Sequence, residues 1–219
     1  MIEKKYITQK REPFFEIARK YIKKNSKVLD VGAGDGAFSE YCDRKDFFLF
    51  EGNPESVNNL KSKFPNVFHG NLPTLPFEDK YFDIIHCSHV IEHLSPAVLH
   101  QTISEFDRCL KDGGVLVISA PLLWSKFYND MSHIKPYNPT VIIKYLTINK
   151  YNTGTRSNIS ESYQVESLIY RYAEKDILEE IYFIKNKWFF WGVKKFMNLL
   201  YKMGMRKYEK SGFTLVIKR

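Results

Sequence analysis

Residues 28–38 have the sequence VLDVGAGDGAF, which combines a strand pattern, a glycine-rich loop and the start of a helix. Its first four residues have the pattern of a short buried strand, and from Ala37 the pattern is helical. The three glycines within residues 32–36 let the backbone turn sharply and approach a ligand closely. A strand, a glycine loop and a helix in this order predict a parallel sheet with a ligand at the loop.

Strand and helix patterns alternate on both sides of this stretch. Further strands are predicted at residues 47–51, 66–69, 82–87 and 115–119. Helices are predicted over residues 12–24, 37–44, 54–63 and 96–112. This alternation predicts an α/β fold, a doubly wound Rossmann-like sheet with helices on both faces. Ligands bind such sheets beyond the carboxyl ends of the strands.

The second half of the chain has weaker patterns. The sequence predicts helices over 139–146, 165–175 and 187–207, strands over 178–184 and 213–218, and a polar loop over 150–162. A strand, a helix and a strand at the end would form an antiparallel hairpin at the sheet edge. We expect one domain over 1–219, with an N-terminal helix in 1–26, a cofactor-binding half over 27–121 and an acceptor-side half over 122–219.

Composition excludes several classes of protein. A chain of 219 residues that is 44% hydrophobic and 26% charged suits one globular domain. No run approaches the roughly 18 apolar residues of a membrane-spanning helix, and residues 1–15 show no apolar signal core. The three cysteines form no CxxC pair, so neither a disulfide framework nor a cysteine zinc site is indicated. We therefore expect a cytoplasmic protein.

Acidic residues beside the glycine loop discriminate between two cofactors. Residues 32–37 satisfy the loose G-x-G-x-x-A pattern of NAD-binding proteins, with Glu51 placed to bind a ribose. However, Asp30 and Asp35 would repel the pyrophosphate, at about 3 kcal/mol for a like-charge contact at about 5 Å and an effective dielectric constant of about 20. S-adenosylmethionine has no phosphate, and its sulfonium and ammonium groups attract carboxylates. The sequence therefore favours S-adenosylmethionine.

Residues 27–121 resemble the class I S-adenosylmethionine-dependent methyltransferases, particularly those of small-molecule type. The matching motifs occur in order: VLDVGAGDG at 28–36, the acid Glu51 after the second strand, the segment 70–94 with its LPFEDKYFD and EHL sequences, and LKDGGVLVISAP at 110–121. The resemblance implies a seven-stranded sheet of order 3-2-1-4-5-7-6, with the seventh strand antiparallel.

The resemblance also implies a set of cofactor-binding residues. Asp30 would contact the methionine part, and Glu51 would bind the ribose hydroxyls. Asn71 stands where the family usually has an acid, and its side-chain carbonyl can accept the hydrogen bond of the adenine amino group. The predicted set is Asp30, Gly32, Ala33, Gly34, Glu51, Gly52, Asn53, Asn71, Leu72 and Ser88.

Two histidines are candidates for handling the proton of the acceptor, because histidine is the natural base near neutral pH. His93 follows the fourth strand, and His133 lies in the loop DMSHIKPYNP, residues 130–139. We predict that His133 is the general base and that His93 orients either His133 or the acceptor. His86 lies inside a strand and is expected in the core.

Two alternatives for this histidine cluster stay open, although the main prediction includes no metal. His89, Glu92 and His93, which can share a helical face, could bind a divalent metal with His133. The resemblance suggests this because some related O-methyltransferases have Glu at the His89 position, followed by Glu and His. A histidine there disfavours magnesium and suits zinc or manganese. Alternatively, Glu92 and His93 form only a structural hydrogen-bonding pair.

The positive charge is concentrated near the C-terminus. Residues 185–219 hold ten Lys or Arg and one acid, a net charge of +9 against +8 for the whole chain. Nucleic-acid binding is therefore unlikely, since such proteins more often carry basic surface across the core. The helix predicted over 187–207 has an apolar stripe opposite Lys194 and Lys195. It would pack on the sheet or make peripheral contact with the inner face of an anionic membrane.

The sequence thus predicts methyl transfer from S-adenosylmethionine to a small-molecule, glycan or lipid-linked acceptor, at oxygen. Two alternatives remain, an NAD-dependent oxidoreductase and a catalytically inactive cofactor-binding partner subunit.

Overall fold

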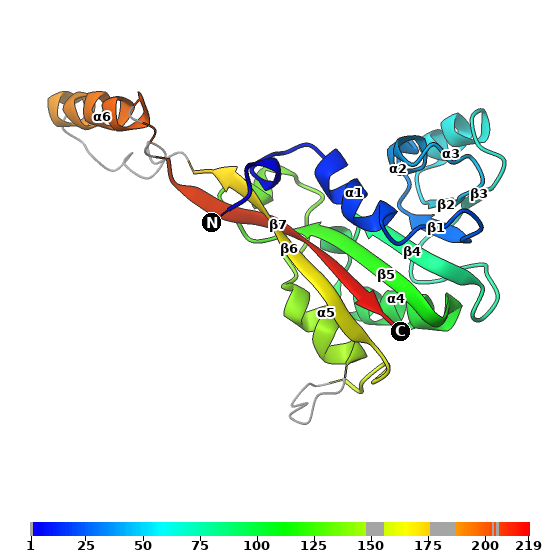
Figure 1. The fold of residues 1–219 in the computed structure, drawn as a ribbon. Helices are drawn as coiled ribbons and strands as arrows, with labels where there is room; N and C mark the ends of the chain where they lie inside the picture. The colour runs from blue at the N-terminus through cyan, green and yellow to red at the C-terminus, as the bar shows by residue number, and fades with distance from the viewer. Residues whose placement is uncertain (1, 148–155, 176–186, 203, 205) are drawn as a thin grey trace.

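The computed structural model describes residues 2–147, 156–175, 187–202, 204 and 206–219. Its sheet has seven strands in the order β3-β2-β1-β4-β5-β7-β6 (Figure 1). The strands are β1 (Val28–Val31), β2 (Phe48–Glu51), β3 (Val67–His69), β4 (Phe82–Ser88), β5 (Leu110–Pro121), β6 (Gln164–Glu174) and β7 (Tyr208–Lys218). Strands β1 to β5 pair in parallel, and β7 is antiparallel to both β5 and β6. The predicted fold class and strand order are confirmed.

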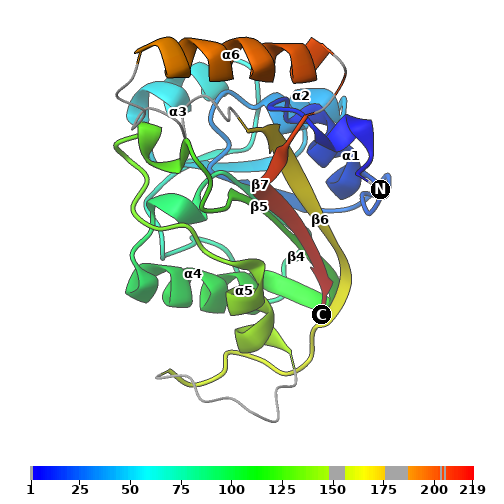
Figure 2. The same ribbon diagram turned by 90° about the vertical axis from the view of Figure 1, so that its left-hand side faces the viewer.

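Helices cover both faces of the sheet. They are α1 (Glu12–Arg19), α2 (Ala37–Tyr41), α3 (Pro54–Lys61), α4 (Pro96–Cys109), α5 (Pro139–Leu146) and α6 (Lys187–Lys202), with short 3-10 turns η1 (Lys4–Tyr6), η2 (Ile91–His93) and η3 (Phe127–Asn129). Asn53, Ser95 and Asn138 cap α3, α4 and α5, and each is followed by proline at the first helical position. Figure 2 shows α1, α2 and α3 on one face and α4 and α5 on the other.

Alternate residues of the central strands pack into two separate hydrophobic cores, one on each face of the sheet. Leu29 and Val31 of β1 pack with the α4 and α5 side, whereas Val28 packs with the α1 to α3 side. Because β1 is covered on both faces, all four of its residues are buried. The glycine loop therefore leaves the sheet from a strand that is buried on both faces.

The prediction of a helix over 165–175 is wrong, because β6 (Gln164–Glu174) takes up all but the last of these residues. The strand pairs along its length with β7, from Gln164 opposite Lys218 to Glu174 opposite Tyr208. Pairing with a neighbouring strand outweighed a local pattern that also fits a helix, and the aromatic and β-branched residues suit a strand. The strand predicted over 178–184 lies outside the described residues.

Several predicted boundaries also shift. The first helix ends at Arg19 rather than at residue 24. After Arg19, the backbone N–H groups of Tyr21 and Ile22 donate to carbonyls three residues earlier, which tightens the last turn. Strand β5 begins at Leu110, which pairs with Phe82, so α4 ends at Cys109. The last helix is described to Lys202.

Helix α6 stands at the same edge of the sheet as the carboxyl ends of the parallel strands. This follows from the pairing of Pro121, the last residue of β5, with Gly212, four residues after β7 begins. Figure 1 shows α6 projecting beyond that end of β6 and β7. In the part of the chain that the structure describes, no helix is long and apolar enough to cross a membrane.

Asp30 and His86 form a buried polar pair between β1 and β4. His86 is 2% exposed and Asp30 is 3% exposed, and the Nδ1–H of His86 donates to Oδ1 of Asp30 at 2.7 Å. The imidazole stacks on Phe38 at a centroid distance of 3.8 Å. The expectation that His86 lies in the core is confirmed, and its hydrogen bond ties the two central strands together.

We expect Asp30→Ala to lower the free energy of unfolding by at least about 2 kcal/mol, because it leaves the buried Nδ1–H of His86 without its acceptor. Urea denaturation measures the change. Glu78→Ala, at an exposed acid, is the control and should stay within about 0.5 kcal/mol of the wild type. If Asp30→Ala also changed the free energy of unfolding by no more than about 0.5 kcal/mol, the Asp30–His86 pair would contribute little to stability.

Candidate active site

A cavity of about 440 Å³ opens at the carboxyl ends of β1, β2, β3 and β4. This position is the point where the strand order reverses, between β1 and β4. The last residues of these strands and the residues that follow them form its walls, together with one residue from the N-terminal segment. The lining comprises Arg11, Val31, Gly32, Gly34, Phe50, Glu51, Gly52, Gly70, Asn71, Leu72, Ser88, His89, Val90, His93 and Leu94.

The glycine loop needs glycine for two distinct reasons. Gly32 has a φ of +69°, and a Cβ atom there would lie 2.2 Å from Cγ2 of Val90. Gly34 has a φ of +58°, and among the described residues nothing lies within 4 Å of its added Cβ. Gly32 is therefore constrained by packing as well as by its backbone, whereas Gly34 leaves room for a ligand.

Glu51 joins the end of β2 to the glycine loop. Its Oε2 accepts a hydrogen bond from the N–H of Gly34 at 2.8 Å, and its Oε1 accepts one from the N–H of Asn53 at 2.8 Å. A carboxylate has further acceptor capacity on each oxygen. Glu51 can thus hold the loop in place and still accept hydrogen bonds from two neighbouring hydroxyl groups.

Seven of the ten predicted cofactor residues line the cavity: Gly32, Gly34, Glu51, Gly52, Asn71, Leu72 and Ser88. The other three face elsewhere. Asp30 bonds to His86, Ala33 packs in the core beside α1 to α3, and Asn53 caps α3 with its side chain. Their predicted contacts with a cofactor stay predictions, and each has a structural role in the described fold.

The sequence did not predict a role for Arg11, which immediately precedes α1 and lines the cavity. No local signal marks it, because only the tertiary fold brings the N-terminal segment to this edge. Val90 was also missed, although its place two residues after β4 could have indicated it under the carboxyl-end rule.

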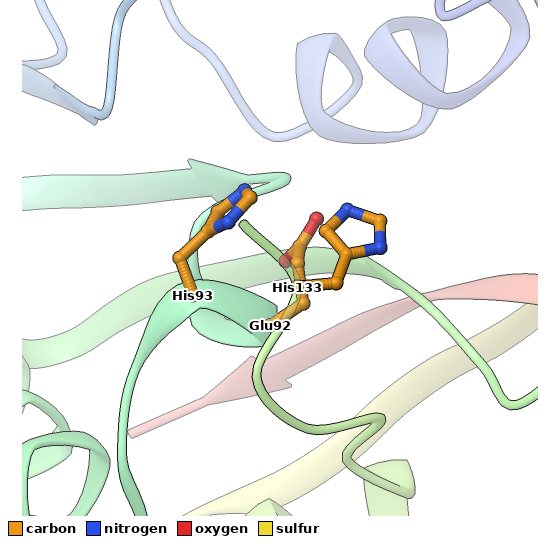
Figure 3. A group of neighbouring side chains, drawn as sticks. All are labelled: Glu92, His93 and His133. Atoms are coloured by element: carbon orange, nitrogen blue, oxygen red, sulfur yellow. The ribbon is translucent and has the colours of Figure 1, made fainter. Parts of the chain in front are cut away.

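His93 and His133 come together beside the cavity (Figure 3). Their ring centroids lie 5.1 Å apart, and His93 itself lines the cavity. Nδ1 of His93 bonds to the carbonyl of Ser132 at 3.0 Å, and Nδ1 of His133 bonds to the carbonyl of Phe127 at 2.7 Å. Because a carbonyl only accepts, both Nδ1 atoms carry the proton, and both Nε2 atoms present a lone pair.

Glu92 connects the two histidines through its backbone. Its carbonyl accepts hydrogen bonds from the N–H groups of Ile134 at 2.8 Å and Lys135 at 3.1 Å, which fixes the loop that carries His133. The side chain of Glu92 is also buried, at 1% exposure. The turn η2 and the loop after η3 thus form one unit.

His89 does not share a helical face with Glu92 and His93. It precedes η2 and has a φ of +57°. Its Nδ1 lies 3.3 Å from Oε1 of Glu92, and its Nε2 accepts from Nη1 of Arg171 at 3.1 Å. Burial lowers the pKa of His89, opposed by Glu92 and reinforced by the charge of Arg171. Burial likewise lowers the pKa of Arg171 to about 10.

Comparisons with known proteins agree with this geometry. Residues 29–118 match a family described as "Methyltransferase domain". The chain is 32% identical over 109 residues to a ubiquinone/menaquinone biosynthesis C-methyltransferase of Campylobacter jejuni, covering 45% of this chain and 46% of that protein. It is 32% identical over 117 residues to a malonyl-[acyl-carrier protein] O-methyltransferase of Coxiella burnetii, covering 50% and 41%.

A solved structure extends the likeness to the whole fold. The crystal structure of a SAM-dependent methyltransferase from Archaeoglobus fulgidus aligns with a TM-score of 0.59 and 23% identity, over 96% of this chain and 95% of that one. By sequence, the chain spans about half the length of the curated relatives it matches. The matched segment carries the glycine loop, Glu51 and η2, so this part of the chain is similar to the class I S-adenosylmethionine-dependent methyltransferases, and the whole chain shares their fold.

Proposed function

We propose that this protein transfers a methyl group from S-adenosylmethionine to a small-molecule, glycan or lipid-linked acceptor, at oxygen. The observation that carries the proposal is the use of the glycine-loop N–H groups. Gly34 donates to Glu51, and Ala37 at the start of α2 donates to Oδ1 of Asp35 at 3.1 Å. In dinucleotide-binding proteins such groups bind the pyrophosphate. Here carboxylates occupy them, which supports a phosphate-free cofactor over NAD.

The cavity residues fit that cofactor. Glu51 would bind the ribose hydroxyls, and Asn71 and Leu72 would contact the adenine. The sulfonium of S-adenosylmethionine supplies a methyl group that is already activated for transfer. The chain therefore has to position an acceptor in line with it and accept a proton, and positioning alone supplies much of the acceleration.

The acceptor side lies at His93 and His133, which we propose as catalytic residues. The backbone carbonyls of Ser132 and Phe127 hold the two rings so that their Nε2 atoms remain available. The choice of oxygen rests on this arrangement, since a hydroxyl acceptor has a proton to lose. The relatives themselves include C- and O-methyltransferases by name.

We further propose that the protein works in the cytoplasm and touches the inner membrane face through α6. Its exposed residues include Trp188 at 87%, Trp191 at 60% and Phe196 at 58%, interspersed with Lys194 and Lys195. Aromatic and basic residues together suit the boundary between lipid headgroups and acyl chains. Because α6 stands at the cavity edge of the sheet, a lipid-linked acceptor would reach the site from that surface.

Cofactor choice is testable by calorimetry with S-adenosylhomocysteine and NAD. We expect the wild type to bind S-adenosylhomocysteine and not NAD, and Gly32→Ala to abolish binding because its Cβ would collide with Val90. Gly113→Ala is the matched control, with a φ of +75° and, within the described chain, nothing within 4 Å of the added Cβ. NAD binding by the wild type without S-adenosylhomocysteine binding would overturn the assignment.

We expect His133→Ala to lower methyl transfer at least about 100-fold while leaving S-adenosylhomocysteine affinity unchanged. The assay follows labelled methyl groups from S-adenosylmethionine into a panel of phenols, methyl glycosides and lipid-linked glycans. His100→Ala, at a histidine that does not line the cavity, should retain wild-type activity. Near-normal transfer by His133→Ala would reject the catalytic role. Cofactor binding with no transfer to any acceptor would favour an inactive partner subunit.

Membrane contact is testable by co-sedimentation with vesicles containing phosphatidylglycerol. We expect wild-type protein to sediment with them and Lys194→Glu/Lys195→Glu to remain largely in solution, since each lysine near an anionic surface contributes about 1 kcal/mol. Lys23→Glu/Lys24→Glu makes the same charge change on exposed residues before β1, at the opposite edge of the sheet. Equal binding by both variants would contradict the role of α6.

A further inference from the structure

We propose that Glu92, His93 and His133 bind a divalent cation of the zinc or manganese type beside the cofactor cavity. Each side chain offers one ligand atom, and these three atoms all lie within 4.8 Å of one another. Figure 3 shows the three side chains converging from η2 and from the loop after η3. The proposal specifies how the acceptor-side histidines act, and cation binding itself does not require methyl transfer.

The carboxylate of Glu92 is the first argument for a cation. It is 1% exposed, and among the described residues neither of its oxygens has a hydrogen-bond partner. The ionisable side chain beside it is His89, whose Nδ1 lies 3.3 Å from Oε1, within ion-pair distance. Arg171 donates to His89 rather than to Glu92. A buried carboxylate whose oxygens accept no hydrogen bond is costly, and a cation at its oxygens would offset that cost.

The orientation of the two imidazoles is the second argument. Metal-binding histidines usually donate their other ring N–H to a carbonyl or carboxylate, which fixes the tautomer and aims the free nitrogen at the metal. Both His93 and His133 do this through Nδ1, to the carbonyls of Ser132 and Phe127. Their Nε2 lone pairs are thus set before any ion arrives.

The donor set indicates which cations fit. Two imidazole nitrogens and one carboxylate suit zinc or manganese, whereas magnesium prefers oxygen ligands and water. His89 does not complete a four-residue site, because its ring nitrogens already face Glu92 and Arg171. Three protein ligands would leave at least one coordination position open. Since His93 lines the cavity, an ion held by this group would lie beside it.

With an ion bound, the Nε2 lone pair of His133 would be committed to it. His133 would then act as a ligand rather than as the general base predicted from sequence. Both roles predict loss of transfer in His133→Ala, so only a direct measurement of metal binding separates them.

The test uses the chelator-treated chain of 219 residues, titrated with Co²⁺ and Zn²⁺. We expect one equivalent of Co²⁺ to give the visible absorption bands of a nitrogen-ligated ion, and Zn²⁺ to displace it. Glu92→Gln keeps the size of the side chain and should weaken Zn²⁺ binding at least about 100-fold. Losing a direct ligand should cost at least as much as losing a residue that only orients a ligand, for which about 100-fold is the upper end. His93→Ala should do the same, and His100→Ala should bind as the wild type does.

Circular dichroism and S-adenosylhomocysteine binding on the same samples separate misfolding from loss of a ligand. Wild-type protein that binds neither ion, or Glu92→Gln that binds Zn²⁺ as tightly as wild type, would overturn the metal site. Cofactor binding without metal binding would remove this proposal alone. Metal binding without cofactor binding would instead remove the proposed methyl transfer.

Discussion

The contact between Glu51 and the glycine loop is the constraint on which the site depends. One carboxylate oxygen holds the N–H of Gly34 and the other holds the N–H of Asn53, so the ends of β1 and β2 and the start of α3 are fixed together. The same contact occupies a loop amide that a pyrophosphate would need. A single acidic side chain therefore shapes the cavity, and in the proposed function it also disfavours a phosphate-containing cofactor.

Much of the fold could be predicted because its signals are local. The glycine loop, the buried strands on either side and the Asn-Pro and Ser-Pro helix starts all lie within short windows. β6 could not be predicted in the same way. Leu168, Ile169 and Tyr170 suit a helix or a strand equally, and their pairing with Leu215, Thr214 and Phe213 involves residues more than 40 positions away.

The site residues show the same contrast between local signals and contacts that only the folded chain makes. The rule that ligands bind beyond the strand ends led to Gly32, Glu51 and Asn71, which line the cavity. It could not show that Asp30, which lies in β1 two residues before Gly32, instead bonds to His86, 56 residues away in the sequence. Nor could it place Arg11 on the cavity wall or Arg171 against His89, since both contacts exist only in the folded chain.

We propose that Glu51 recognises the ribose of a phosphate-free nucleoside at the end of β2. A crystal structure of the protein with S-adenosylhomocysteine would test this recognition. We expect the ribose hydroxyls on the two oxygens of Glu51 and the sulfur directed toward His93, with Asp30 still bonded to His86. An empty cavity in crystals soaked at saturating ligand, or a ligand bound with Glu51 turned away from its ribose, would contradict it.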